Sequence, residues 1–177
     1  MARSLQKAGD QVGTELEKRV EELCLEEGIV IQKVRTEMAE FQLNLQFPSP
    51  QSSLNVFQPK GKEDTIIVGA VIEVSDTHKQ GLRALDIKKR EEFIWNLRLM
   101  LAQGRVEFEM RHPDNILERV RVHTFLFQDG FSKQAFMNAL LDVNRSKLQV
   151  IWFIQKEFGV SPPSPSPSLD EGTSMYR

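Results

Sequence analysis

Hydrophobic residues recur at helical spacing from Phe131 to Gly159, and this stretch organises the rest of the chain. Ser132 can cap its first turn, and Phe131 and Phe136 flank that cap with the spacing of a hydrophobic staple. Gly159 can adopt the left-handed conformation that ends a helix. One face of the predicted helix is apolar and should pack against the core. Its members are Phe136, Leu140, Val143, Val150, Ile151, Ile154 and Phe158.

Two further segments have the helical period. Residues 5–27 carry an apolar stripe with charged residues mostly outside it, and a glycine follows as a stop signal. Residues 86–103 begin at a potential aspartate cap and also end before a glycine. Residues 75–85 are polar and predict only a short helical turn ahead of this second main helix.

Strands are predicted where apolar and polar residues alternate, namely over residues 41–47, 54–58, 106–110 and 119–126. Residues 66–74 instead form an almost unbroken apolar run, which is typical of a strand covered on both faces. We therefore place this strand centrally in the sheet. Residues 29–34 are apolar and β-branched, and the pattern leaves open whether they form a separate strand or lead into the next one.

The last two predicted strands form a hairpin around the turn at residues 112–115. Its register should place apolar groups together on the dry face and opposite charges together on the wet face. The pairs that follow are Val106–Val122, Phe108–Val120, Glu107–Arg121 and Glu109–Arg119.

These elements predict an α+β fold, in the order α-βββ-α-ββ-α. A twisted, mostly antiparallel sheet of about five strands is covered by three main helices. The length of 177 residues suits one domain over residues 1–160 and a tail. Residues 161–177 are rich in proline and serine, so we expect an extended tail that does not join the core.

Composition and charge restrict the classes of function. The chain is 40% hydrophobic and 27% charged, as in ordinary globular proteins. Its net charge of -2 disfavours a broad electrostatic contact with nucleic acid. No apolar run is long enough to span a membrane, and the first residues lack the apolar block of a signal peptide. Cys24 is the single cysteine, which excludes an internal disulfide and predicts a reduced, cytoplasmic setting.

The sequence predicts no catalytic, cofactor-binding or metal site. His78, His112 and His123 lie in different elements, without a second ligand at metal-binding spacing. Gly61-Lys62 lacks the upstream glycine of a phosphate-binding loop, and no nucleophile elbow occurs. We therefore expect a protein that is not an enzyme.

Partner-binding residues are predicted on the two main helices. Trp152 and Phe153 point away from the apolar face of the last helix, and Trp95 is a large aromatic on the preceding one. Desolvated aromatics commonly anchor interfaces. Lys147 lies within the apolar face. Its stem can pack while its amine reaches the rim, or its amine can line a groove or a subunit contact.

Four stretches carry a resemblance to known proteins: Val56-Phe57-Gln58-Pro59, Ile66–Val74, Glu92-Phe93-Ile94-Trp95-Asn96-Leu97-Arg98 and Phe131–Phe158. They resemble a family of small prokaryotic proteins of unknown function that is placed in the type III secretion-chaperone-like fold. The resemblance spans roughly residues 5–158 and consists mostly of core positions. Members of the broader fold often dimerise and bind extended client segments, so the resemblance implies both for this protein.

Three hypotheses about function follow. The first is a non-enzymatic protein-binding or chaperone-like adaptor that acts as a homodimer and holds a client protein or peptide. The second is an enzyme whose dispersed site carries no motif. The third is nucleic-acid binding through the small basic strip of Arg119, Arg121 and His123, for which cross-strand ion pairs are the simpler interpretation.

Overall fold

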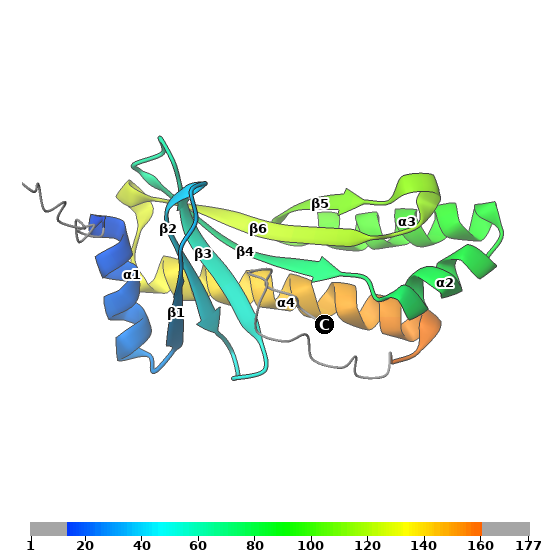
Figure 1. Cartoon of the computed structure of the whole chain (residues 1–177), viewed down its shortest axis with the longest axis horizontal. Helices are drawn as coiled ribbons and strands as arrows, with labels where there is room; N and C mark the ends of the chain where they lie inside the picture. Colours follow the sequence, from blue (N-terminus) through cyan, green and yellow to red (C-terminus); the bar gives the residue numbers. More distant parts are fainter. Residues whose placement is uncertain (1–13, 161–177) are drawn as a thin grey trace, which may run out of the picture.

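The computed structural model of the protein describes residues 14–160 (Figure 1). Within these residues, six strands form one antiparallel sheet. They are β1 (Val30–Val34), β2 (Ala39–Gln46), β3 (Ser53–Pro59), β4 (Thr65–Glu73), β5 (Glu107–Arg111) and β6 (Arg119–Phe127). Their order across the sheet is β1-β2-β3-β4-β6-β5, so the apolar run that forms β4 has a strand on each side, as predicted.

The sheet consists of two three-stranded wings, β1-β2-β3 and β4-β6-β5, which meet where β3 pairs with β4 over a short ladder. β4 pairs with β6 along its whole length, and β2 pairs with β3 from end to end. By contrast, β3 pairs with β4 only at residues 55–57 and 67–69. Figure 1 shows the consequence, since β3 crosses β4 and then turns away from it.

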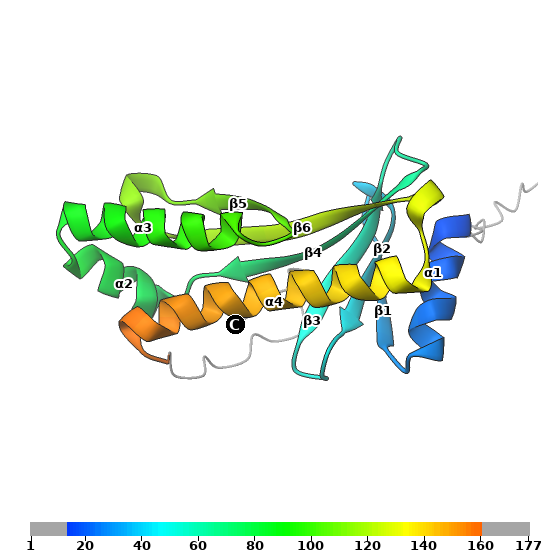
Figure 2. The same ribbon diagram turned by 180° about the vertical axis from the view of Figure 1, so that it is seen from behind.

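The helices cover one face of this twisted sheet. α3 and α4 lie side by side in front of the strands in Figure 2, and the sheet lies in front of them in Figure 1. α2 packs against the end of α4. The helices are α1 (Glu15–Glu26), α2 (Asp76–Ala84), α3 (Ile87–Ala102) and α4 (Lys133–Phe158), and the 3₁₀ turns are η1 (Pro113–Asn115) and η2 (Gln128–Gly130).

α4 forms as the sequence predicts. The Ser132 hydroxyl accepts from Ala135 N at 3.1 Å, and the rings of Phe131 and Phe136 lie 5.9 Å apart across this cap. Gly159 ends the helix with a φ of 79°, in the left-handed region that favours glycine. The buried face of α4 lies mainly against β4 and β6 of one wing, and α4 also contacts β3 of the other, so one helix bridges the two wings.

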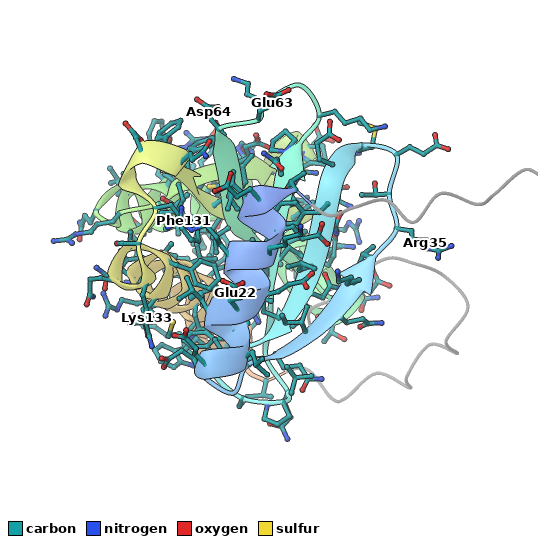
Figure 3. All side chains as sticks on the ribbon, turned by 90° about the vertical axis from the view of Figure 1, so that its left-hand side faces the viewer. Glu22, Arg35, Glu63, Asp64, Phe131 and Lys133 are labelled. Atoms are coloured by element: carbon teal, nitrogen blue, oxygen red, sulfur yellow. The ribbon has the colours of Figure 1, made fainter. Side chains whose placement is uncertain are left out.

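α1 is attached to the start of α4, as Figure 3 shows around Phe131 and Lys133. The Arg19 guanidinium donates to the carbonyl of Phe131 at 3.0 Å and lies 4.8 Å from the centre of its ring. Lys133 Nζ lies 3.2 Å from Glu26 and 2.5 Å from Glu27. These contacts close the end of the core opposite to α2.

The α+β class and the order of elements are confirmed, and the structure adds two elements to the prediction. Residues 30–34 form a separate strand, so the sheet has six strands instead of about five. Residues 76–84 form a whole helix instead of a single turn, because Leu82 and His78 are buried against the rest of the protein. The predicted helical residues 5–13 and the predicted tail at 161–177 lie outside the described residues.

The predicted register of the β5–β6 hairpin is wrong by two residues. Ile116 and Leu117, which follow the predicted turn, are buried. They lengthen one side of the loop and shift the pairing. A shift of two keeps every side chain on its predicted face of the sheet. The observed pairs are Glu107–His123, Phe108–Val122, Glu109–Arg121 and Met110–Val120.

Two adjacent leucines on α4 provide a test of its orientation. Leu140 is fully buried, whereas Leu141 is 46% exposed. We expect Leu140→Ala to lower the free energy of unfolding by about 2–5 kcal/mol, because it leaves a cavity in the core. Leu141→Ala is the matched control and should change it by less than about 1 kcal/mol. Urea unfolding at low protein concentration measures both, and equal losses would contradict this orientation.

Candidate protein-interaction surfaces

Four large apolar side chains are exposed on the side of α3 and α4 that faces away from the sheet, and we call this surface the helix face. Trp95 and Trp152 are 56% and 60% exposed, and the leucines are exposed to a similar degree. α3 and α4 lie side by side over the same face of the sheet (Figure 2). Each helix buries the side opposite to these residues, so the four side chains lie on the outer side of this helical layer. The four are Trp95, Leu99, Leu141 and Trp152. Exposed apolar groups gathered on one face are typical of interaction sites.

A hollow of about 290 Å³ lies between α4 and the end of α3, next to the helix face. Its α4 wall includes Asp142, Arg145 and Gln149, and its other wall combines the apolar side chain of Met100 with Gln103 and Arg105. Arg145 and Asp142 form an ion pair at 3.5 Å across the rim. The hollow therefore combines one apolar side chain with several hydrogen-bonding groups, which can take an amphipathic side chain such as tryptophan.

Phe153 does not belong to the helix face. It is half-buried, and its ring lies 5.0 Å from that of Phe93 on α3. The expectation that Phe153 points away from the core is therefore wrong, because α3 lies beside α4 and covers this flank. Trp95 and Trp152 are exposed on separate helices, and the Trp95 ring is covered only in part by the Arg98 guanidinium at 4.7 Å.

Lys147 is buried, with only 4% of its surface exposed. Its amine donates to Ser52 Oγ at 3.0 Å and to the carbonyl of Ser53 at 3.2 Å. Ser53 opens β3 before the ladder with β4 begins at Asn55, so the lysine satisfies a carbonyl at the point where the two wings separate. The amine therefore does not reach the rim, and it binds the β2–β3 loop instead of a groove.

Burial lowers the pKa of Lys147 from 10.5 to about 8. A desolvated amine beside a serine hydroxyl is also the arrangement of serine–lysine hydrolases, in which lysine is the base and serine the nucleophile. Such a site also needs N–H donors directed at the substrate oxygen. The N–H of Ser52 instead donates to Ser49 at 3.0 Å, and Ser52 Oγ lies 3.4 Å from Asn144 Oδ1. These contacts favour a structural role for Lys147.

The face of the sheet opposite the helices, the outer sheet face, carries a second apolar group. Phe57 and Ile67 are directly paired across β3 and β4, and Ile67 is paired with Phe125 on β6. Phe125 and Phe127 are 43% and 53% exposed. On β2, the residue paired with Phe57 is Gln42, so the aromatic patch borders a polar, uncharged side chain.

The basic strip on β6 is engaged in ion pairs. Arg119 Nε is hydrogen-bonded to Glu73 Oε1 on β4, and Arg121 lies 3.2 Å from Glu109 on β5. His123 lies at the edge of the Phe125 ring. The arginine charges are therefore matched by neighbouring carboxylates, which is the simpler interpretation given above.

The remaining candidate groups do not converge. Within residues 14–160, no cluster of three or more His, Cys, Asp or Glu side chains could hold a metal ion. His78 Nε2 lies 3.0 Å from the carbonyl of Gly159, and His112 Nε2 lies 3.1 Å from Arg98. Cys24 is buried, and burial raises the pKa of its thiol to about 12. Within the same residues, no helix has both the length and the apolar character of a membrane span.

The sequence did not predict the aromatic patch, the hollow or the partners of Lys147. The aromatic patch escaped notice because Phe57, Phe125 and Phe127 belong to different strands, and only their register brings them together. The hollow depends on the position of α3 beside α4. Lys147 was identified as unusual, but its partners come from a loop about 95 residues earlier in the chain.

The burial of Lys147 should make stability depend on pH. Between pH 8 and 10.5 the unfolded chain still holds the lysine proton that the folded protein has released, so the free energy of unfolding should rise with pH. The lysine contribution over this range is about 3 kcal/mol, from 1.36 kcal/mol for each unit of pKa. Urea unfolding at pH 7 and at pH 10.5 gives the free energy of unfolding of the wild type and of Lys147→Met. The difference between the two proteins should change by this amount between the two pH values.

Two comparisons isolate the effect. Cys24 acts in the opposite direction, because its unfolded thiol loses a proton more easily than the folded one, but it is common to both proteins and cancels in the difference. Lys156→Met removes an exposed lysine from the same helix. A pH-dependent difference of equal size for that variant would refute the assignment to Lys147.

Comparison with known proteins places the fold in a family. A crystal structure of an uncharacterized protein from Methanothermobacter thermautotrophicus is similar, with 36% identity and a TM-score of 0.77 over 81% of this chain and 99% of that one. YbjN from E. coli has 18% identity and a TM-score of 0.45 over 82% of this chain and 92% of that one.

No curated protein matches the chain. The model of an uncharacterized conserved protein family, DUF2299, matches residues 16–154, which include nearly all of the described elements. The resemblance to a family of unknown function is thus confirmed, and the chain belongs to the uncharacterized conserved protein family DUF2299.

Proposed function

We propose that this protein is a non-enzymatic protein-binding module that forms a homodimer through its helix face and acts as an adaptor for a client protein. The observation that carries the proposal is the exposure of Trp95, Leu99, Leu141 and Trp152 on one surface. Burying a large aromatic side chain contributes strongly to association, and tryptophan is enriched among the residues that dominate interfaces.

The outer sheet face supports the adaptor part of the proposal. It lies on the side of the sheet that α3 and α4 leave open (Figure 1). Phe125 and Phe127 are exposed there, in the same row of paired residues as Phe57 or next to it. A module with apolar groups on two opposite sides can hold a second copy on one side and an apolar client segment on the other. The single cysteine, Cys24, is consistent with a reduced, cytoplasmic setting for this role.

The two rival functions have less support. The ion pairs of Arg119 and Arg121 reduce the positive charge that a phosphate backbone would require. For an enzyme, the residues with the most suggestive geometry are Lys147 and Ser52, and their remaining contacts favour a role in holding the β2–β3 loop. Neither arrangement offers an assembled site.

Removing Trp152 tests the helix face. Sedimentation equilibrium should find the wild type dimeric at tens of micromolar. Trp152→Ala should raise the dimer dissociation constant by about tenfold or more, because each dimer loses two buried indoles. A strictly monomeric wild type at this concentration would refute the proposed homodimer.

Leu25→Ala is the matched control, since Leu25 on α1 is 82% exposed and lies outside the helix face. It should leave the dissociation constant unchanged. Equal weakening by both substitutions would mean that exposed apolar groups associate without specificity. Circular dichroism of each variant establishes that its fold is retained.

A further inference from the structure

The exposed side of α4 carries a pattern that is complementary to itself. Leu141, Arg145, Leu148 and Trp152 follow one another every three or four residues and therefore form one stripe along the helix. Leu141, Arg145 and Trp152 are exposed, and Leu148 is half-buried. Reversing the helix about a point midway between positions 148 and 149 exchanges Arg145 with Trp152 and leaves Leu148 near the centre.

From this pattern we infer that α4 packs antiparallel against α4 of a second copy, with Trp152 of each copy entering the hollow beside Arg145 of the other. The inference rests on the proposed homodimer and gives it a geometry. Because the arrangement has two-fold symmetry, each contact occurs twice.

The hollow lies where this arrangement requires it. Its α4 wall is formed by Asp142, Arg145, Ser146 and Gln149, so its middle lies at the level of Arg145, opposite Trp152 of the second copy. The volume of about 290 Å³ provides room for an indole. The oxygens of Asp142 and Gln149 can accept its N–H, and the guanidinium of Arg145 can lie against its ring.

Charge disfavours the other alignments of the two helices. In a parallel pair, Arg145 would lie opposite Arg145 of the second copy and Lys156 opposite Lys156, so like charges would face each other. An antiparallel pair with Leu141 opposite Trp152 would bring the two Arg145 side chains to about 4.5 Å along the axis. The inferred alignment separates them by about 10 Å and sets Asp142 close to Lys156 of the second copy.

α3 widens the contact. The two-fold axis runs perpendicular to the two α4 helices. It therefore places α3 of both copies on the same side of the α4–α4 contact, which we call the α4 seam. Trp95 and Leu99 are therefore covered together with the α4 stripe. A stable interface buries roughly 800 Å² on each partner, more than a single pair of helices readily supplies, so this second helix is needed.

Cysteine cross-linking tests the alignment on the full chain. Cys24 is buried with a raised thiol pKa of about 12, so it gives little background. The two copies of Leu148→Cys should lie about 1.5 Å apart along the axis and form a disulfide-linked dimer under mild oxidation. Leu141→Cys is the matched control, because its two copies should lie about 22 Å apart and stay unlinked. Non-reducing electrophoresis reads out both.

The outcomes separate this geometry from the proposed function. If sedimentation finds a Leu148→Cys dimer that does not cross-link, the α4 seam is wrong and the homodimer stands. Cross-linking of Arg145→Cys in place of Leu148→Cys would overturn the alignment in favour of another register. A monomeric wild type would overturn both proposals. Loss of the Leu148→Cys disulfide when Trp152→Ala is added, with the fold retained, would support the inferred placement of the indole.

Discussion

The burial of α4 against β4 and β6 is the interaction on which the rest of the structure depends. The two wings of the sheet share a ladder of only three residue pairs, which alone could not fix their relative orientation. α4 contacts both wings, and its ends are held by α1 on one side and by α2 on the other. Because one rigid helix serves all of these contacts, its buried face runs along the helix from Phe136 to Ile154, with Lys147 as a charged member that is satisfied by the β2–β3 loop.

This arrangement also determines which surfaces remain open. α4 packs on the inner face of the sheet, so its own outward side remains exposed on the helix face. The outer sheet face is not covered by α4 either. The sequence places aromatic residues on both of these surfaces, where solvent exposure of such groups is unfavourable. Binding partners would remove these groups from solvent. In the proposed assembly, a second copy covers the helix face and a client segment covers the outer sheet face.

The sequence predicts those features that depend on contacts between residues close together in the chain. The cap at Ser132, the staple between Phe131 and Phe136, and the central position of β4 follow from neighbouring residues and were predicted correctly. The hairpin register was not, because it depends on the burial of Ile116 and Leu117 by distant elements. Trp152 could be placed outside the core from its period alone, whereas the burial of Phe153 required the position of α3.

The short ladder between β3 and β4 has a consequence for the order of folding. Each wing can form its own hairpins early, since their pairings join segments that are close in the chain. The cover for both wings, α4, is the last of the described elements in the sequence. During synthesis the apolar inner surfaces of both wings thus wait for this helix to emerge, and throughout that interval the nascent chain exposes surface that can aggregate.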